Sequence, residues 1–297
     1  MICNHNTSPV SPKRVVVLGA SGFVGGDIIE YLSKQNIENI GLSSSDLDLC
    51  DSGATSQLGK VIQRTDSLVV VSAITPDKGR DAATFMRNLS MIEHLCQFLS
   101  ESPCAHVVYI SSDAVYDDHA HPVREDSCCG PTSFHGLMHL ARERMLLATL
   151  KEPGTPLMIL RPSLLYGTND THNTYGPNRF IRLAQEGSNI SLFGNGEEKR
   201  DHVFISDLSS IIGLCLLHRT TGILNVATGS SASFADVAQL AVELHSKGTK
   251  IECNPRANPI THRHFDTTNV IKAFPSFAFT PLSIGLAETA SLNEIHA

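Results

Sequence analysis

The sequence predicts an α/β protein with a doubly wound, mostly parallel sheet and a smaller lobe formed by the C-terminal part of the chain. Short runs of apolar, often β-branched residues alternate with longer helical stretches from residue 15 to about residue 161. The runs are apolar at consecutive positions, which is typical of parallel strands covered on both faces. A glycine-rich turn follows the first run directly, and beyond Pro162 the segments become shorter and richer in Gly, Asn and Pro. Together these observations predict the two-part architecture.

The predicted elements alternate between strand and helix. Strands are expected over residues 15–18, 37–42, 67–73, 107–111 and 157–161, with a short piece at 190–193. Helices are expected over residues 25–34, about 82–100 and 134–150, and again at 180–186, 208–217 and 234–245. Because helices separate the strands of the first half, those strands are expected to run parallel.

Charge and cysteine content exclude several classes of function. The 297-residue chain has a net charge of −7, and without a basic surplus nucleic acid is not expected as a partner. Its eight cysteines include no Cys-x-x-Cys pair, so a zinc ribbon or a thioredoxin-type site is not supported. No apolar run reaches the length of a membrane span and the first residues lack an apolar signal core, so we expect a cytoplasmic protein with no membrane partner.

The turn after the first predicted strand has the spacing G-x-x-G-x-x-G. Its glycines allow a tight turn and a close approach of the backbone, and the helix that follows offers free N–H groups to a diphosphate. A strand before this turn and a helix after it make it a dinucleotide-binding fingerprint of a Rossmann-type fold. The residues expected to contact the cofactor here are Gly19, Ser21, Gly22, Phe23, Val24 and Gly25.

The end of the second predicted strand bears on the choice between NAD and NADP. Dinucleotide-binding folds that take NAD commonly place an acid here to hold the ribose 2′-hydroxyl. In this chain Ser44 could hydrogen-bond either a hydroxyl or a 2′-phosphate. Because no arginine lies nearby in the sequence to pair with a 2′-phosphate, NAD is favoured, although NADP is also compatible.

Three parts of the chain follow from this pattern. A flexible, polar tail is expected over residues 1–13, an NAD(P)-binding Rossmann domain over 14–165, and mainly a substrate-binding lobe over 166–297. Within the lobe, residues from about 203 to 245 return to helical patterns and are expected to pack back on the Rossmann domain.

Further motifs follow the glycine turn in a characteristic order. They read DLDLCD at 46–51, SSDAVY at 111–116, LRPSLLYG at 160–167, GNGEEKRDHVFISDL at 194–208 and LNVATG at 224–229. With them the chain resembles the extended short-chain dehydrogenase/reductases, which include NAD-dependent nucleotide-sugar epimerases, dehydratases and 4-ketosugar reductases. The resemblance runs from residue 14 to about 289, and it implies a nucleotide-sugar substrate and a homodimer.

The resemblance also implies roles for single residues outside the glycine turn. Toward the cofactor, it places Asp48 and Leu49 at the adenine, Ser72 and Ala73 over the pyrophosphate and ribose, and Asn88 on the following helix.

Toward the substrate, the resemblance assigns Ser112 to the reacting sugar oxygen and Arg200 to the nucleotide diphosphate. It also places Asp113, Asn178 and Arg179 at the substrate, whereas a further motif residue, Asp207, is expected to be structural and to fix the substrate loop.

One departure from the family's pattern concerns its Tyr-x-x-x-Lys signature. The corresponding stretch at 135–143 reads HGLMHLARE, so His135 takes the tyrosine position and His139 the lysine position, while the glycine, leucine and glutamate match. The segment from Tyr175 to Arg179 imitates the signature, but Pro177 inside it is hostile to a helix.

The two histidines are chemically coherent as a catalytic pair. A phenol with a pKa of about 10 must be lowered to exchange protons at neutral pH, whereas an imidazole starts at about 6.5. His135 is therefore expected to transfer the proton, with a pH limb at about 6 to 7.5. Their i, i+4 spacing puts both rings on one helix face, from which His139 could donate a hydrogen bond to the nicotinamide ribose.

Two other interpretations of the same substitution stay open. A protein that kept its pockets but lost proton transfer would be a non-catalytic NAD(P)-binding regulatory or partner subunit. Alternatively, His135, His139 and Glu143 share a helix face, with Cys128 and Cys129 shortly before them. A metal there would occupy the nicotinamide position, so no metal ligand is assigned. The sequence thus predicts an NAD(P)-dependent enzyme that transfers hydride at a carbon of a nucleotide-activated sugar.

Overall fold

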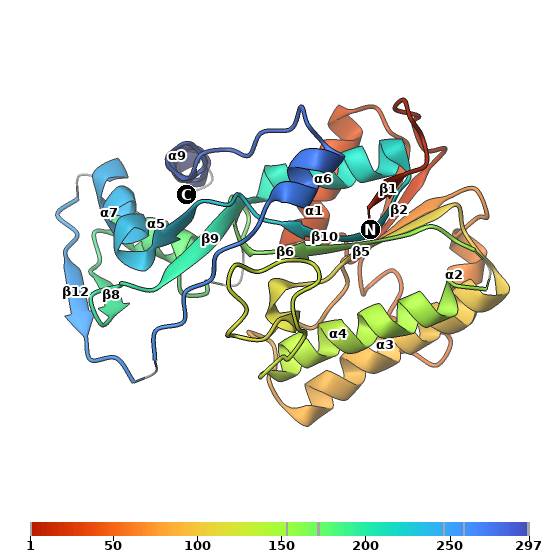
Figure 1. Ribbon diagram of the computed structural model, residues 1–297, viewed down its shortest axis with the longest axis horizontal. Coiled ribbons are helices and arrows are strands. Elements are labelled where there is room, and N and C mark those ends of the chain that lie inside the picture. The colour runs from red at the N-terminus through yellow and green to blue at the C-terminus, as the bar shows by residue number, and fades with distance from the viewer. Residues whose placement is uncertain (1, 153, 171–172, 246, 258, 296–297) are drawn as a thin grey trace.

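The computed structural model describes residues 2–295 apart from 153, 171–172, 246 and 258. Its centre is a seven-stranded sheet in the order β1-β10-β6-β5-β4-β2-β3, drawn in Figure 1. The neighbouring strands from β10 to β3 pair in parallel, which confirms the predicted fold class. Their bounds are β2 (Val15–Leu18), β3 (Asn39–Leu42), β4 (Ser67–Val70), β5 (His106–Ile110), β6 (Leu157–Pro162) and β10 (Thr220–Val226).

Two layers of helices cover the sheet, one on each face (Figure 1). One layer holds α1 (Phe23–Lys34) and α6 (Ile205–His218), and the other holds α2 (Ala54–Val61), α3 (Ala82–Glu101) and α4 (Phe134–Thr149). Val15 and Val17 of β2 pack into the first layer, whereas Val16 and Leu18 pack into the second. Both faces of the strand are therefore buried, which explains its uninterrupted apolar sequence.

A smaller lobe lies beside the carboxyl ends of the strands, at the left of Figure 1. In it, three helices pack against one another next to a three-stranded and a two-stranded sheet. The strands are β7 (Leu164–Tyr166), β8 (Ile190–Phe193), β9 (Lys199–Phe204), β11 (Ser231–Ser233) and β12 (Ile251–Asn254). The helices are α5 (Pro177–Glu186), α7 (Phe234–Leu244) and α9 (Leu282–Ile295), while the short α8 (Thr268–Ala273) packs on β10.

The lobe boundary is less simple than predicted. Helix α6 packs against α1 and β10 is a strand of the central sheet, so residues 205–226 do return to the Rossmann domain. Helix α7, however, packs against α5 and α9 inside the smaller lobe. The expectation for residues 234–245 was therefore wrong, because a helical pattern does not say which layer receives its apolar face.

The start of the chain is also fixed rather than loose. Cys3 and Asn4 form β1 (Cys3–Asn4), which pairs antiparallel with β10. The backbone N–H groups of Asn6 and Val10 donate to carbonyl groups at the end of α6. The prediction of a flexible tail over 1–13 fails here, because polar residues can still satisfy the free backbone groups of an edge strand. Residue 1 lies outside the described residues.

All eight cysteines are free thiols. Across the residues described, no helix is both long and apolar enough to cross a membrane.

Candidate active site

The order of the sheet reverses at β2, which has β3 on one side and β4 on the other. In doubly wound sheets ligands bind at the carboxyl ends of two neighbouring strands whose following connections run to opposite faces of the sheet. Gly19 follows β2 at this point with a φ of +96°, and a Cβ atom on it would lie 2.7 Å from the Ser72 nitrogen. A Cβ on Gly25 would lie 2.1 Å from the Gly19 oxygen. Only glycine fits these two positions, so the turn stays tight.

A cavity of about 420 Å³ opens above this turn. It brings together eleven residues that the sequence predicted to contact the cofactor, although they come from four segments. They are Gly19, Ser21, Gly22, Phe23, Val24, Gly25, Ser44, Asp48, Leu49, Ser72 and Ala73. Helix α1 begins after Gly22 without a side-chain cap, and the buried Ser72 hydroxyl has no hydrogen-bond partner among the described residues. The cavity therefore presents the unpaired donors that a diphosphate requires.

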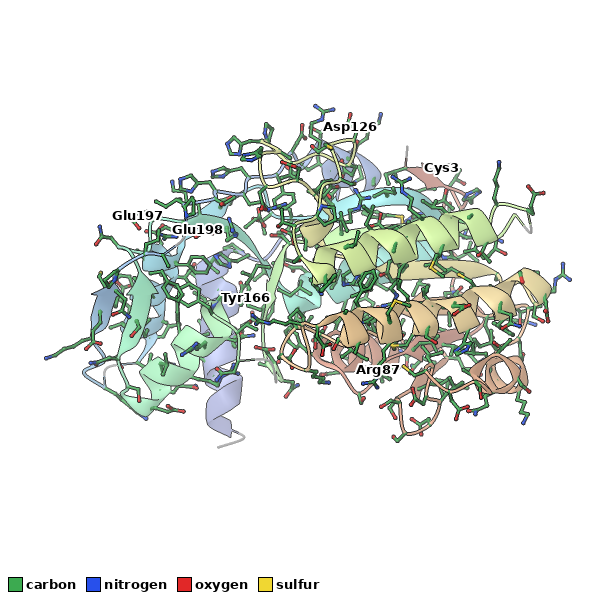
Figure 2. All side chains as sticks on the ribbon, turned by 90° about the horizontal axis from the view of Figure 1, so that it is seen from below. Cys3, Arg87, Asp126, Tyr166, Glu197 and Glu198 are labelled. Carbon is green, nitrogen blue, oxygen red and sulfur yellow. The ribbon has the colours of Figure 1, made fainter. Side chains whose placement is uncertain are left out.

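Two cationic residues of this cavity were missed. Lys78, after β4, and Arg87, on α3, both line it, and the Cys50 thiol donates to the Arg87 carbonyl. The view in Figure 2 shows Arg87 on α3. No arginine is near Ser44 in the sequence, but in the folded protein Arg87 lines the same cavity as Ser44. Helix α3 brings Arg87 to the same cavity, which weakens the preference for NAD over NADP.

Asn88, which was expected to contact the cofactor, does not line this cavity. Its amide oxygen accepts from the Ile74 nitrogen at 2.9 Å, and its amide nitrogen donates to the Ile74 and Thr84 carbonyls. The residue is only 2% exposed. Its polar atoms are thus committed to the loop after β4, and Asn88 positions that loop.

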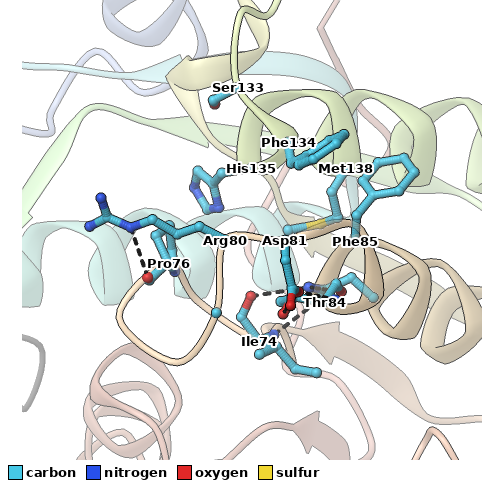
Figure 3. A pocket seen from close by; sticks show the side chains of 12 residues that line it. Ile74, Pro76, Arg80, Asp81, Thr84, Phe85, Ser133, Phe134, His135 and Met138 are labelled. Atoms are coloured by element: carbon cyan, nitrogen blue, oxygen red, sulfur yellow. Dashed lines mark hydrogen bonds between the residues drawn. The ribbon is translucent and has the colours of Figure 1, made fainter.

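His135 lies in the wall of an adjoining cavity of about 410 Å³, which shares Ile74 with the first. Figure 3 shows its ring projecting from the start of α4 toward the loop that carries Pro76 and Arg80. Its Nδ1 atom is buried without a hydrogen-bond partner among the described residues. Burial lowers the pKa of His135 below its ordinary value, so the ring is neutral at pH 7. The expected pH limb at about 6 to 7.5 therefore moves to lower pH.

His139 lies behind His135 and lines neither cavity. The two rings meet edge to face with centroids 4.7 Å apart. The Nδ1 atom of His139 is 2.8 Å from the hydroxyl of Tyr109 on β5, and burial lowers the pKa of His139 well below its ordinary value. The sequence suggested that His139 contacts the cofactor ribose directly. This placement does not favour that contact.

Ser112 follows β5 and caps the short helix η1 (Asp113–Val115), where its hydroxyl accepts from the Ala114 nitrogen at 3.1 Å. The start of α4 packs against this turn. A Cβ on Gly136 would lie 2.0 Å from the Ala114 carbonyl oxygen, so only glycine permits the approach. This contact brings the elements that carry Ser112 and His135 together.

Arg200 projects from β9 and is already paired. Its Nη2 atom lies 2.5 Å from Glu198, and its Nη1 atom donates to the Thr261 carbonyl. Glu198 also binds Arg256 at 2.9 Å; Figure 2 shows Glu198 in the smaller lobe. A substrate diphosphate would thus have to replace protein contacts of Arg200.

A second arginine, Arg263, reaches the same region and was not singled out from the sequence. Its side chain is 9% exposed and contacts Asp118 at 2.8 Å and the Asp113 carboxylate at 3.9 Å. Burial raises the pKa of Asp113, while Arg263 and Arg200 oppose that rise. The site therefore combines two arginines with the half-buried carboxylate of Asp113.

The other predicted substrate residues differ in their surroundings. Asn178 is buried, and its side chain accepts from the Gly167 nitrogen at 3.0 Å, whereas Arg179 is exposed on α5. Asp207, which was expected to fix the substrate loop, accepts two hydrogen bonds from Thr280 before α9. It thus holds the C-terminal segment rather than the substrate loop.

A buried ion pair anchors α4 beneath the site. Arg161 of β6 binds both carboxylate oxygens of Glu143, at 2.9 and 2.6 Å, and Ser111 donates to the same carboxylate. Arg161 also donates to the Tyr116 hydroxyl, and burial raises the pKa of Tyr116 to about 12. Glu143 is therefore occupied by protein partners. Within the described part of the chain, no three His, Cys, Asp or Glu side chains could hold a metal ion.

Comparison with known proteins places this site in a family. The family model described as "NAD dependent epimerase/dehydratase family" matches residues 15–227, from β2 through β10. The chain belongs to the NAD-dependent epimerase/dehydratase family. The match takes in the glycine turn, both cavities and His135, so the resemblance seen in the sequence is confirmed.

Curated relatives of this epimerase/dehydratase chain share low identity over most of its length. A protein described as an uncharacterized UDP-glucose epimerase of Bacillus subtilis is 21% identical over 264 residues, which is 79% of this chain and 83% of that protein. UDP-glucose 4-epimerase of Vibrio cholerae is 24% identical over 253 residues, covering 78% of this chain and 76% of the relative.

Solved structures show the same fold. A UDP-glucose 4-epimerase from Thermotoga maritima, solved with UDP-glucose, superposes with a TM-score of 0.84 at 18% identity, covering 95% of this chain and 99% of that one. A GDP-L-fucose synthetase from Naegleria fowleri, bound to NADP, gives 0.85 at 15% identity, covering 99% and 98%.

Proposed function

We propose that this protein is an NAD-dependent enzyme that modifies a nucleotide-activated sugar through hydride transfer at a sugar carbon, with His135 moving the proton. One observation carries the proposal. The cavity at the switch point, with its unpaired donors, adjoins the cavity whose wall contains His135. Family membership and nucleotide-sugar-modifying relatives support the same reaction class.

The residues around the first cavity fit a nicotinamide dinucleotide. The backbone from Gly19 to Gly25 and the Ser72 hydroxyl would hold the diphosphate, and Asp48 would accept from a ribose hydroxyl or the adenine. When bound, the nicotinamide supplies the acceptor and donor of hydride. NADP is compatible as well, since Lys78 and Arg87 line the same cavity.

The protein's own chemistry at the substrate centres on His135. Its neutral ring can accept a proton from a sugar hydroxyl during oxidation, and return it when the keto group is reduced. Among the described residues its Nδ1 atom has no hydrogen-bond partner that would fix the tautomer, so a bound ligand would complete the arrangement. Ser112 would orient the reacting oxygen.

A second candidate, a non-catalytic NAD-binding subunit, is favoured by the state of Arg200. The arginine expected at the substrate diphosphate is engaged by Glu198 and Thr261. A protein that binds only the dinucleotide would have no need to free Arg200 from these partners.

Two measurements on the purified protein separate these candidates. Mass spectrometry after denaturation would identify a co-purified dinucleotide, and incubation with NAD and UDP-glucose, UDP-N-acetylglucosamine or GDP-mannose would test for turnover. A dinucleotide together with turnover supports the enzyme, whereas a dinucleotide with no turnover across pH 5 to 9 supports the non-catalytic subunit.

We also propose a cytoplasmic homodimer. Large apolar side chains are exposed on α3 and α4, namely Met86 at 60%, Phe134 at 47%, Leu137 at 41% and Leu147 at 39%. Such a patch on two adjacent helices suits an interface between two copies. Light scattering at micromolar concentration would measure the mass, and a monomer would overturn the proposal.

A further inference from the structure

Arg142 on α4 is a buried cation without an acidic partner. Its side chain is 0% exposed. The guanidinium donates to the Ser72 carbonyl at 2.8 Å, contacts the Met138 sulfur at 3.7 Å, and lies 5.3 Å from the centre of the Tyr109 ring. Its Nε atom is buried with no partner, and no carboxylate among the described residues forms an ion pair with it.

The surrounding groups do not neutralise this charge. Glu143, the next residue, is held by Arg161 instead. Burial raises the pKa of Tyr109 to about 12 and lowers the pKa of His139 well below its ordinary value, so both are neutral at pH 7. An unpaired buried guanidinium destabilises a fold by itself, which points to a role outside folding.

Arg142 contacts a residue in the wall of the cavity above the glycine turn. Ser72 and Ala73 line that cavity, and Gly19 abuts Ser72. Arg142 holds the Ser72 carbonyl from behind. In a trans peptide the carbonyl and the following N–H point in opposite directions, so the Ala73 N–H is directed away from Arg142. Among the described residues no group accepts from it.

We infer that Arg142 is a positioning residue for the diphosphate of the dinucleotide. It would supply a fixed positive charge behind the cavity wall, and it would keep the peptide after Ser72 turned so that the Ala73 N–H faces the ligand. Both effects favour an anion in front of the wall and do little for an uncharged ligand. The inference rests on the proposed binding of NAD.

The test compares Arg142→Met with Arg144→Met, which removes the same charge from an exposed position of the same helix. Calorimetry would measure the affinity for NAD, for ADP-ribose and for adenosine, and a thermal scan would measure the melting temperature of each ligand-free variant. We expect Arg142→Met to bind NAD and ADP-ribose about tenfold more weakly. Adenosine affinity should stay unchanged and the ligand-free melting temperature should be equal or higher. Arg144→Met should resemble the unaltered protein throughout.

Other outcomes are equally clear. If Arg142→Met loses affinity for adenosine and NAD equally and melts at a lower temperature, Arg142 is a structural residue and the inference is overturned. Unchanged NAD affinity would overturn it as well. If Arg142→Met does not fold, Arg142→Lys, which keeps the charge, is measured instead. Its affinity for NAD should stay close to that of the unaltered protein, and an equal loss of NAD and adenosine affinity would overturn the inference. Failure of the unaltered protein to bind NAD would instead refute the proposed function.

Discussion

The hydroxyl of Tyr109 and the Nδ1 atom of His139 lie 2.8 Å apart in the interior, between β5 and α4. The tyrosine is 1% exposed and the histidine 6%. This hydrogen bond engages His139 in the interior, whereas His135, one turn earlier on α4, lines a cavity.

Tyr109→Phe tests this pairing. The substitution removes the hydroxyl and leaves the His139 Nδ1 atom buried without a partner, so unfolding should become easier by about 1–3 kcal/mol. Denaturant unfolding at pH 7 would measure it, with the affinity for NAD as a second readout. If NAD affinity falls while stability is unchanged, His139 has a direct role at the cofactor.

Gly22 and Gly25 should respond differently to substitution. A Cβ on Gly22 would meet only the Gly19 oxygen at 3.4 Å, whereas on Gly25 the distance is 2.1 Å. Gly22→Ala should therefore fold and retain most NAD binding, and Gly22→Asp should fold but lose it because a carboxylate then faces the diphosphate. Gly25→Ala should disrupt the turn. Equal NAD affinity for Gly22→Asp and Gly22→Ala in calorimetry would place the diphosphate elsewhere.

The activity of His135 should depend on pH in one direction. Burial lowers its pKa below the ordinary value, and a proton acceptor must be neutral, so turnover should be constant near pH 7 and fall only at a lower pH than for an ordinary histidine. His135→Ala should abolish that limb and lower turnover by about 10²–10⁴. The control is His119→Ala, an exposed histidine. Retention of full turnover by His135→Ala would leave the proton transfer to another group.

Arg200 and Glu198 give a paired prediction about the substrate. Because Glu198 occupies the guanidinium, Glu198→Gln should release it and tighten the binding of UDP-glucose, while Arg200→Ala should weaken that binding by about 1.5–3 kcal/mol. Neither change should alter NAD affinity. Calorimetry with each ligand separates the effects, and an equal loss for both ligands would mean that Arg200 is structural.

His202 should limit stability in acid. Both of its ring nitrogens are buried without partners among the described residues, and burial lowers its pKa to about 4. Between this value and the unfolded value of about 6.5, the unfolded chain binds more protons. Stability from this group is therefore fully present above pH 6.5 and is lost as the pH falls toward 4, by roughly 3 kcal/mol. His202→Phe should flatten that part of the stability curve, as measured by denaturant unfolding. An unchanged slope would show that other groups set the acid sensitivity.

The glycine turn could be predicted because it is encoded within a few residues of a strand end, whereas the place of Ser72 and Ala73 after β4 was implied by the family resemblance. The contacts that were missed join distant segments. Arg263 meets Asp113 across 150 positions, and Arg87 approaches the 48–50 loop from another helix. No local pattern encodes such a meeting. The two-residue β1 was missed for a different reason, since an element so short has no periodicity.

That short strand has a consequence for the surface of the protein. An edge strand displays a row of unpaired N–H and C=O groups, which can pair with a strand of another molecule and start aggregation. Strand β1 covers part of this row on β10, and it is too short and too polar to offer a new edge of comparable length. The first residues of the chain thus shorten the stretch of β10 that is open to strand addition.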